Sequence, residues 1–100
     1  MARVLSLVTF AIEPCHKDEF LRRAAEQLKP YWEAHGSERY EVYEEVGPAG
    51  PTGRLVEVNV LRDREAYAEM SRFVREAGTL PEVAYRHVRE PNFQVMELKV

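Results

Sequence analysis

The chain has 100 residues and a formal net charge of −3 at pH 7, and this length is typical of one domain. Proteins that bind nucleic acid usually concentrate basic residues on one face, whereas the only adjacent basic pair here, Arg22 and Arg23, lies among acidic neighbours. The most apolar stretch, residues 4–12, is too short to span a bilayer. We therefore expect one soluble domain with neither nucleic acid nor membrane as a partner.

The cysteine content and the first residues indicate where the protein works. Cys15 is the single cysteine and cannot form an internal disulfide, and the first residues lack the pattern of a secretory signal. These features predict a cytoplasmic protein. Charged residues are mainly arginine and glutamate, a bias that fits a thermophilic source and fits codon usage equally well.

The first 35 residues predict a strand and a helix. Residues 3–12 are rich in β-branched and aromatic side chains and stop before Pro14, as a strand does. Apolar residues then recur every three or four positions over residues 17–35, which is typical of a helix. Pro30 costs about 3 kcal/mol in a regular helix, so we expect a kink or break near Lys29. The apolar residues of this pattern are Phe20, Leu21, Ala24, Ala25, Leu28, Tyr31 and Trp32.

A hairpin is predicted next. Residues 38–46 alternate as a half-exposed strand should, and residues 54–61 place alternate side chains on two faces. The glycines and prolines of residues 47–53 predict a flexible turn between the two strands.

A second helix and a last strand complete the pattern. Asp63 is expected to cap a helix that ends at Gly78, with Ala66, Tyr67, Met70, Phe73, Val74 and Ala77 buried. Thr79 and Glu82 have capping-box spacing, which predicts a short helix over residues 81–89 before a strand at residues 93–100. This order predicts an α+β, ferredoxin-like βαββαβ fold, in which both helices cover one face of an antiparallel sheet.

Both faces of the predicted sheet are apolar, although the helices can cover only one. A face that met water would be polar. The first strand offers Val4, Ser6, Val8, Phe10 and Ile12 on one face and Leu5, Leu7, Thr9 and Ala11 on the other, and the last strand offers Phe93 and Val95 against Met96, Leu98 and Val100. We therefore predict a homodimer through the sheet faces, since a twofold dimer is the commonest way to cover such a patch.

Three residues are candidates for catalysis. Glu57 and Asn59 share one face of the third predicted strand, and in an apolar pocket desolvation would raise the pKa of the carboxyl toward a value useful for a general base. The alternative is that this face lies at a dimer interface or a wet edge, where the pair makes ordinary hydrogen bonds. His87 follows the second helix, where its ring faces either the pocket mouth or solvent.

The remaining candidates belong to a ligand pocket. Trp32, Tyr67 and Tyr85 are expected to pack against the sheet, where a small planar aromatic ligand would share the space. His35 is expected to stabilise the end of the first helix, with pocket lining as the alternative. The histidines form no HxH or HxxxH pattern, so we expect no dedicated metal site. We also expect no cofactor, because the reaction of an electron-rich phenolate with oxygen would need only a base.

Five segments resemble the dimeric α/β-barrel superfamily, and within it the antibiotic biosynthesis monooxygenase-like proteins. They are Leu5-Ser-Leu-Val-Thr-Phe10, Trp32-Glu-Ala-His-Gly36, Tyr40-Glu-Val-Tyr-Glu-Glu45, Leu55-Val-Glu-Val-Asn-Val60 and Asp63-Arg-Glu-Ala-Tyr67. The resemblance covers almost the whole chain. It implies two ferredoxin-like chains whose sheets pack together, with a pocket in each chain between sheet and helices.

The same architecture serves cofactor-free oxygenases of polycyclic phenols, haem-degrading enzymes, lactone isomerases and ligand sensors, so the fold does not choose a function. Our first hypothesis is a cofactor-independent monooxygenase-like enzyme acting on a small aromatic substrate. The alternative is a non-catalytic small-ligand-binding or stress-response barrel protein, whose pocket is filled by side chains. A regulator's sensing domain, normally joined to a helix-turn-helix segment, ranks last. A structure without a cavity for a bicyclic ligand would favour the alternative.

Overall fold

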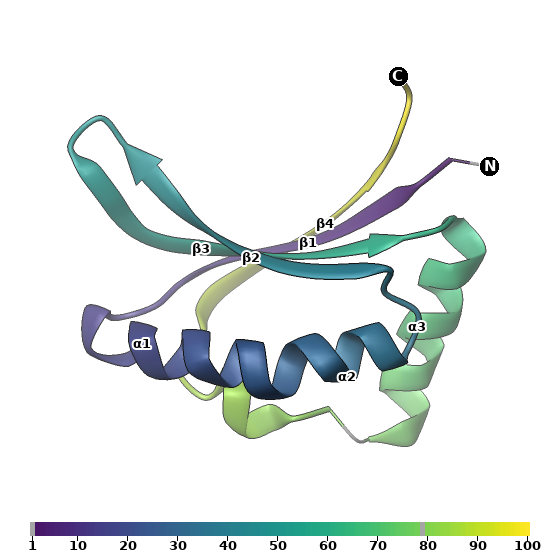
Figure 1. Cartoon of the computed structure of the whole chain (residues 1–100), viewed down its shortest axis with the longest axis horizontal. Helices are drawn as coiled ribbons and strands as arrows, with labels where there is room; N and C mark the ends of the chain where they lie inside the picture. Colours follow the sequence, from purple (N-terminus) through teal and green to yellow (C-terminus); the bar gives the residue numbers. More distant parts are fainter. Residues whose placement is uncertain (1, 79) are drawn as a thin grey trace.

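Four antiparallel strands form one sheet, and all the helices lie on one of its faces (Figure 1). The computed structural model describes residues 2–78 and 80–100 and gives the strand order β2-β3-β1-β4. The strands are β1 (Val4–Ala11), β2 (Arg39–Gly47), β3 (Gly50–Leu61) and β4 (Arg89–Glu97), and the helices are α1 (Pro14–Arg23), η1 (Ala24–Leu28), α2 (Lys29–Ala34), α3 (Arg64–Ala77) and η2 (Glu82–Tyr85). The predicted ferredoxin-like βαββαβ fold is confirmed.

The register between the two central strands decides which side chains share a face. Ser6 of β1 lies opposite Asn59 of β3, and Val8 lies opposite Glu57. Because directly opposed residues point to the same side of a sheet, these four side chains all lie on the face that the helices cover.

The helical segment from α1 to α2 is continuous, and its middle turn, η1, is a π-helix. At the end of this turn the N–H of Lys29 donates a hydrogen bond to the carbonyl of Ala24, five residues earlier. Pro30 has no N–H to donate and would crowd the turn before it, so a widened turn accommodates it without a break. The disturbance predicted near Lys29 therefore takes the form of a π-turn.

The π-turn also explains which side chains of this helix are buried. Four residues spaced four apart, Phe20, Ala24, Leu28 and Trp32, are buried against the sheet. In a regular α-helix, side chains spaced four apart rotate progressively around the helix axis. The extra residue of a π-turn rotates the later side chains back to the side of the helix that faces the sheet. Leu21 and Ala25 belong to the apolar pattern of this segment but are exposed.

The hairpin of β2 and β3 is longer than predicted. Val46 pairs with Pro51 and Gly47 pairs with Gly50, so most of residues 47–53 is strand and not a flexible turn. Gly50 and Gly53 have φ values of +114° and +88°, which glycine adopts without strain. Since β1 pairs with β3 only as far as Arg54, Pro51 lies where the sheet has no neighbour on that side.

β4 begins at Arg89 and ends at Glu97, earlier at both ends than predicted. It is an edge strand, where a proline is tolerated. The register with β1 shifts between Thr9 and Ala11, and Glu90 has a φ of 52°, so a β-bulge accommodates Pro91. The helix predicted over residues 81–89 is the single turn η2, and Thr79, its predicted cap, lies outside the described residues.

α3 begins and ends at the residues that the capping pattern predicted. The side chain of Asp63 accepts a hydrogen bond of 2.8 Å from the N–H of Ala66, and Gly78 ends the helix with a φ of 61°. Ala66 and Met70 are buried, whereas Ala77 is exposed and not buried as predicted. No helix within the described residues is both long and apolar enough to cross a membrane.

The face of the sheet away from the helices carries apolar side chains, as the alternation predicts. Leu5 and Leu7 of β1 are half-buried there, and Tyr43 and Met96 have exposed fractions of 54% and 48%. The main hydrophobic core lies on the opposite side, between sheet and helices, and includes Phe10, Phe20, Leu28, Leu55 and Leu61.

Candidate functional site

A cavity of about 540 Å³ lies between the sheet, α3 and the segment around η2. Small-molecule sites usually measure roughly 300–1,000 Å³ and combine apolar walls with a few polar groups. The lining residues are Ser6, Val8, Trp32, Glu57, Asn59, Tyr67, Met70, Ser71, Val74, Arg75, Leu80, Tyr85, Val88, Pro91 and Phe93. The cavity is therefore large enough for a bicyclic ligand.

Glu57 is the acidic residue of this cavity, and only 3% of it is exposed. Its Oε2 accepts two hydrogen bonds, of 2.6 Å from the hydroxyl of Tyr40 and of 2.9 Å from the hydroxyl of Tyr85. The Tyr85 hydroxyl in turn accepts a hydrogen bond of 2.9 Å from Nε1 of Trp32. Oε1 of Glu57 has no hydrogen-bond partner among the described residues, so it remains available to a ligand.

Burial sets the protonation of this group. It raises the pKa of Glu57 above its ordinary value, and the hydrogen bonds from Tyr40 and Tyr85 oppose the rise without cancelling it. Burial and the neighbouring carboxylate also raise the pKa of both tyrosines, so their hydroxyls keep their protons and remain donors. Glu57 is thus the group of this network whose pKa moves toward neutral pH.

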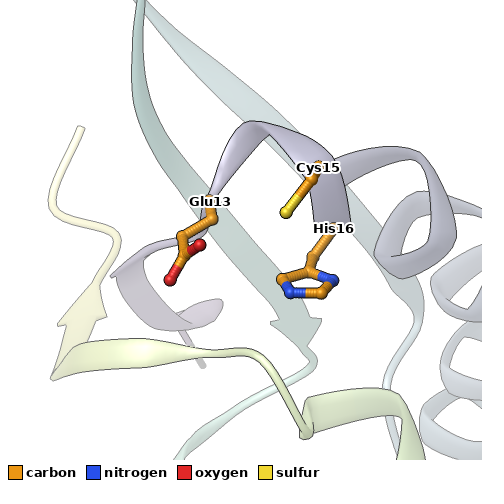
Figure 2. Close-up of side chains that lie close together, drawn as sticks. All are labelled: Glu13, Cys15 and His16. Carbon is orange, nitrogen blue, oxygen red and sulfur yellow. The ribbon is translucent and has the colours of Figure 1, made fainter.

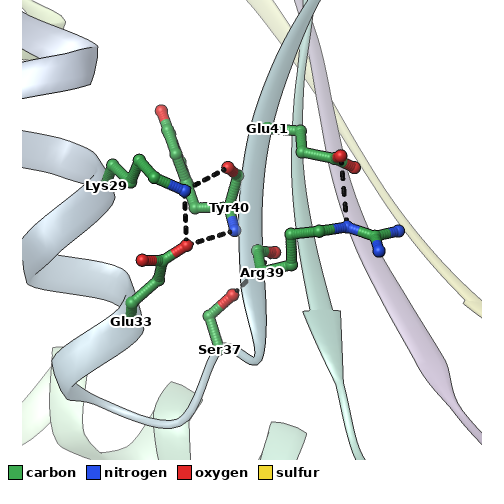
Figure 3. A network of polar contacts seen from close by, with 6 residues as sticks. All are labelled: Lys29, Glu33, Ser37, Arg39, Tyr40 and Glu41. Atoms are coloured by element: carbon green, nitrogen blue, oxygen red, sulfur yellow. Dashed lines mark hydrogen bonds and ion pairs between the residues drawn. The ribbon is translucent and has the colours of Figure 1, made fainter.

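Tyr40 is held in place by contacts between α2 and the start of β2 (Figure 3). Its N–H donates to Oε2 of Glu33 at 3.0 Å, and its carbonyl accepts from Nζ of Lys29 at 3.4 Å. Lys29 and Glu33 also form an ion pair of 2.7 Å, and Oγ of Ser37 donates to the carbonyl of Arg39 at 3.0 Å. These bonds fix the backbone from which Tyr40 reaches Glu57.

Asn59 supplies a second acceptor in the cavity wall. It is 4% exposed, and its Oδ1 is buried without a hydrogen-bond partner among the described residues. A buried polar atom left unpaired costs about 1–3 kcal/mol. A ligand that brings an N–H or O–H group to this point would remove that cost.

Five of the predicted site residues line one cavity: Trp32, Glu57, Asn59, Tyr67 and Tyr85. Glu57 and Asn59 are buried on the face that the helices cover, and not at a solvent-exposed edge. Glu57 nevertheless makes the ordinary hydrogen bonds that the alternative expected. Two predicted residues do not line the cavity: the ring of His35 stacks on Phe73 with centroids 4.0 Å apart, and that of His87 stacks on His16 at 3.5 Å.

Tyr40 and Arg75 were not among the predicted residues. Tyr40 lies on the helix-facing side of β2 opposite Asn59, a position that depends on the pairing of β2 with β3. Arg75 lies in the last turn of α3 and adds a cation to the cavity wall. The alternation of residues 38–46 could have placed Tyr40 on the buried face of its strand. Arg75 lies outside the apolar stripe of α3, so the sequence pattern did not indicate that it lines the cavity.

Folding also brings possible metal ligands together, which the spacing along the sequence did not predict. The ligand atoms of His16, Glu19 and His87 all lie within 4.8 Å of one another. Those of Glu13, Cys15 and His16, at the start of α1, do so as well (Figure 2).

No protein-family model and no curated protein matches the chain, but solved structures share its fold. A conserved protein of Methanosarcina mazei matches with a TM-score of 0.71 and 16% identity over 99% of this chain and 95% of that one. A dimeric ferredoxin-like protein from an uncultured marine organism has a TM-score of 0.64 and 16% identity over 100% and 96% of the two chains. A candidate antibiotic biosynthesis monooxygenase of Nitrosomonas europaea has a TM-score of 0.67 and 11% identity over 96% and 89%. Identities this low show a shared fold alone.

Proposed function

We propose that the cavity binds a small hydroxylated aromatic molecule and that the protein is a cofactor-independent monooxygenase-like enzyme. The observation that carries this proposal is the buried Glu57 in the wall of an apolar cavity, with one oxygen that has no hydrogen-bond partner among the described residues. A carboxylate in that position is suited to accept the proton of a phenolic hydroxyl, because its raised pKa strengthens it as a base.

The proposed reaction uses dioxygen as the oxidant. Glu57 takes the hydroxyl proton and leaves an electron-rich phenolate, whose ring carbon donates electrons to dioxygen. A carbon–oxygen bond forms at this ring carbon, which loses its hydrogen, and the O–O bond breaks. One oxygen atom becomes a new ring carbonyl, and the other leaves as water with that hydrogen and the proton taken by Glu57. For 1-naphthol this gives 1,4-naphthoquinone and one water molecule for each dioxygen consumed.

The surroundings of Glu57 support a ligand of this kind. Trp32, Tyr67 and Phe93 offer aromatic surface to a planar ring system. In the described part of the chain Oδ1 of Asn59 has no donor, and a second hydroxyl of the ligand would supply one. Arg75 favours an anionic intermediate by its charge. One protein with the same fold carries the name of an antibiotic biosynthesis monooxygenase candidate, and another that of a possible oxidoreductase.

The test is oxygen consumption by the purified protein with 1-naphthol as the substrate. We expect uptake that is proportional to protein concentration and yields 1,4-naphthoquinone. The control is 1-methoxynaphthalene, which has the same ring system but no acidic proton and should give no uptake. Equal rates with the two compounds, or no uptake with any hydroxylated bicyclic compound, would remove the proposal.

A second candidate function is non-catalytic binding of the same class of ligand. It is favoured by the hydrogen-bond network of Trp32, Tyr85, Glu57 and Tyr40, since a purely structural buried carboxyl is satisfied in the same way. Calorimetry separates the candidates: binding of 1-naphthol without oxygen uptake would support the binder.

We also propose that the chain forms a homodimer through the face of the sheet away from the helices. Leu5, Leu7, Tyr43 and Met96 lie on this face, and proteins described as dimeric and ferredoxin-like share the fold. An exposed apolar patch of this kind is typical of an interface.

Replacing Leu7 by arginine is expected to convert the dimer to a monomer, because a charge in the centre of an apolar interface loses its hydration without gaining a partner. Light scattering should give twice 11.6 kDa for the natural chain and 11.6 kDa for Leu7→Arg. Leu21→Arg, on the exposed side of α1, is the matched control and should remain dimeric. A monomeric natural chain at micromolar concentration would contradict the proposal.

A further inference from the structure

Two histidines that are 71 positions apart lie face to face beside the start of α1. The rings of His16 and His87 are stacked, with centroids 3.5 Å apart and an angle of 1° between their planes. His16 belongs to the first turn of α1, and His87 to the segment between η2 and β4. Both are half-buried, and neither lines the cavity that contains Glu57.

Glu19 adds a carboxylate to this pair. It follows His16 by three residues on α1, so the two side chains lie on the same side of the helix. Oε1 of Glu19 accepts a hydrogen bond of 3.1 Å from Nε of Arg23, while Oε2 has no hydrogen-bond partner within the described part of the chain. This bond and the nearby charges of Arg23, His87 and Arg86 lower the pKa of Glu19, although burial opposes the effect.

We propose that His16, Glu19 and His87 bind a divalent transition-metal ion of the zinc type. Two imidazoles and one carboxylate are a ligand set of zinc sites that keep a fourth position for water. The ligand atoms lie within 4.8 Å of one another, against about 3.3 Å between ligands of a tetrahedral zinc ion, so the three side chains must move closer together to hold an ion. The hydrogen bond from Arg23 would orient the carboxylate, as outer partners of metal ligands commonly do.

Binding requires the stack to open. The lone pair of an imidazole nitrogen lies in the plane of its ring, and parallel rings cannot aim two lone pairs at one ion. At least one ring must therefore turn about its side-chain bonds, and both have room to do so because they are half-buried.

The charges around the site limit its affinity. Arg23 and Arg86 lie near Glu19, and the N-terminal end of a helix repels a cation. We therefore expect a dissociation constant in the micromolar range, weaker than that of structural zinc sites.

Glu13, Cys15 and His16 form a competing group that shares His16 (Figure 2). Glu13 and Cys15 are exposed, and Glu13 is already paired with Arg89 at 2.7 Å. The half-buried group with two imidazoles is the better site for a borderline metal, so we assign the ion to His16, Glu19 and His87.

The test is titration of the chelator-treated full chain with Co²⁺, followed by its visible absorption, and with Zn²⁺, followed by calorimetry. We expect visible cobalt bands and one ion per chain, with at least about tenfold weaker binding for His16→Ala, His87→Ala and Glu19→Gln. His35→Ala removes the remaining histidine, which stacks on Phe73, and should bind as the natural chain does. Cys15→Ser should also leave binding unchanged.

Thermal unfolding provides a readout that does not depend on cobalt. Zn²⁺ should raise the Tm of the natural chain and of His35→Ala but not that of His87→Ala, while the circular dichroism of all three without metal should be the same. A sulfur-to-cobalt charge-transfer band that disappears in Cys15→Ser would move the ion to the competing group and overturn the assignment. Equal binding by His87→Ala and the natural chain would overturn it too.

Discussion

Replacing Glu57 by glutamine is expected to lower kcat/KM for oxygen uptake with 1-naphthol by about 10²–10⁴-fold, the usual contribution of a general base. Glutamine has nearly the same volume, and its carbonyl can accept the hydrogen bonds from Tyr40 and Tyr85, but it cannot take a proton. The loss should therefore fall on turnover and not on folding. Steady-state kinetics with the natural chain and Glu57→Gln measure it.

The pH dependence follows from the same group. Because burial raises the pKa of Glu57, kcat/KM should decline as pH falls through that raised value, at a pH above the ordinary range of a carboxyl. Folding gives the opposite sign: the folded chain binds this proton more tightly than the unfolded one, so stability falls as pH rises from the ordinary pKa to the raised value. Glu57→Gln should lack this fall.

Glu26→Gln is the matched control for these measurements. Glu26 is exposed on η1, does not line the cavity, and pairs with Arg22 at 3.3 Å. It should retain the full rate. If Glu57→Gln kept more than about a tenth of the natural kcat/KM, the role of Glu57 as the base would be refuted.

Replacing Phe10 by alanine is expected to destabilise the domain by about 3–5 kcal/mol, because it removes a large side chain from a packed core and leaves a cavity. Phe10 is 1% exposed and meets the ring of Phe20 edge to face, with centroids 5.1 Å apart. Domains of this size are stable by roughly 5–15 kcal/mol, so the loss is a large part of the total. Urea unfolding followed by circular dichroism measures it.

Two controls separate the core effect from a general one. Phe10→Leu keeps most of the buried volume and should cost less than Phe10→Ala. Val46→Ala, at a residue that is 68% exposed in the hairpin, should change stability by less than about 0.5 kcal/mol. A loss below about 1 kcal/mol for Phe10→Ala would mean that this residue is not part of a packed core.

Sequence periodicity was enough to predict the order of helices and strands and several residues that line the cavity. The period of two in β3 places Glu57 and Asn59 on one face, and the helix stripe places Trp32 and Tyr67 against the same space, without knowledge of pairing. Local signals at Asp63 and Gly78 likewise fixed the bounds of α3, because capping depends on neighbouring residues only.

The features that the sequence did not predict depend on contacts between segments that are distant in the sequence. Pro51 and Pro91 are tolerated within strands because of their places in the sheet, which their own neighbours in sequence do not reveal. The contact of Tyr40 with Glu57 depends on the register of β2 against β3, and that of His16 with His87 on where the chain passes after η2. None of these contacts between distant segments produces a periodic pattern in the sequence.

We propose that Glu57 faces a cavity suited to a hydroxylated aromatic ligand, and a crystal structure of the protein with 1-naphthol is the decisive test. We predict the naphthalene ring between α3 and the sheet, with its hydroxyl donating a hydrogen bond to Oε1 of Glu57. A structure in which side chains fill this cavity, or in which the ligand binds with its hydroxyl away from both Glu57 and Asn59, would refute this role of the cavity.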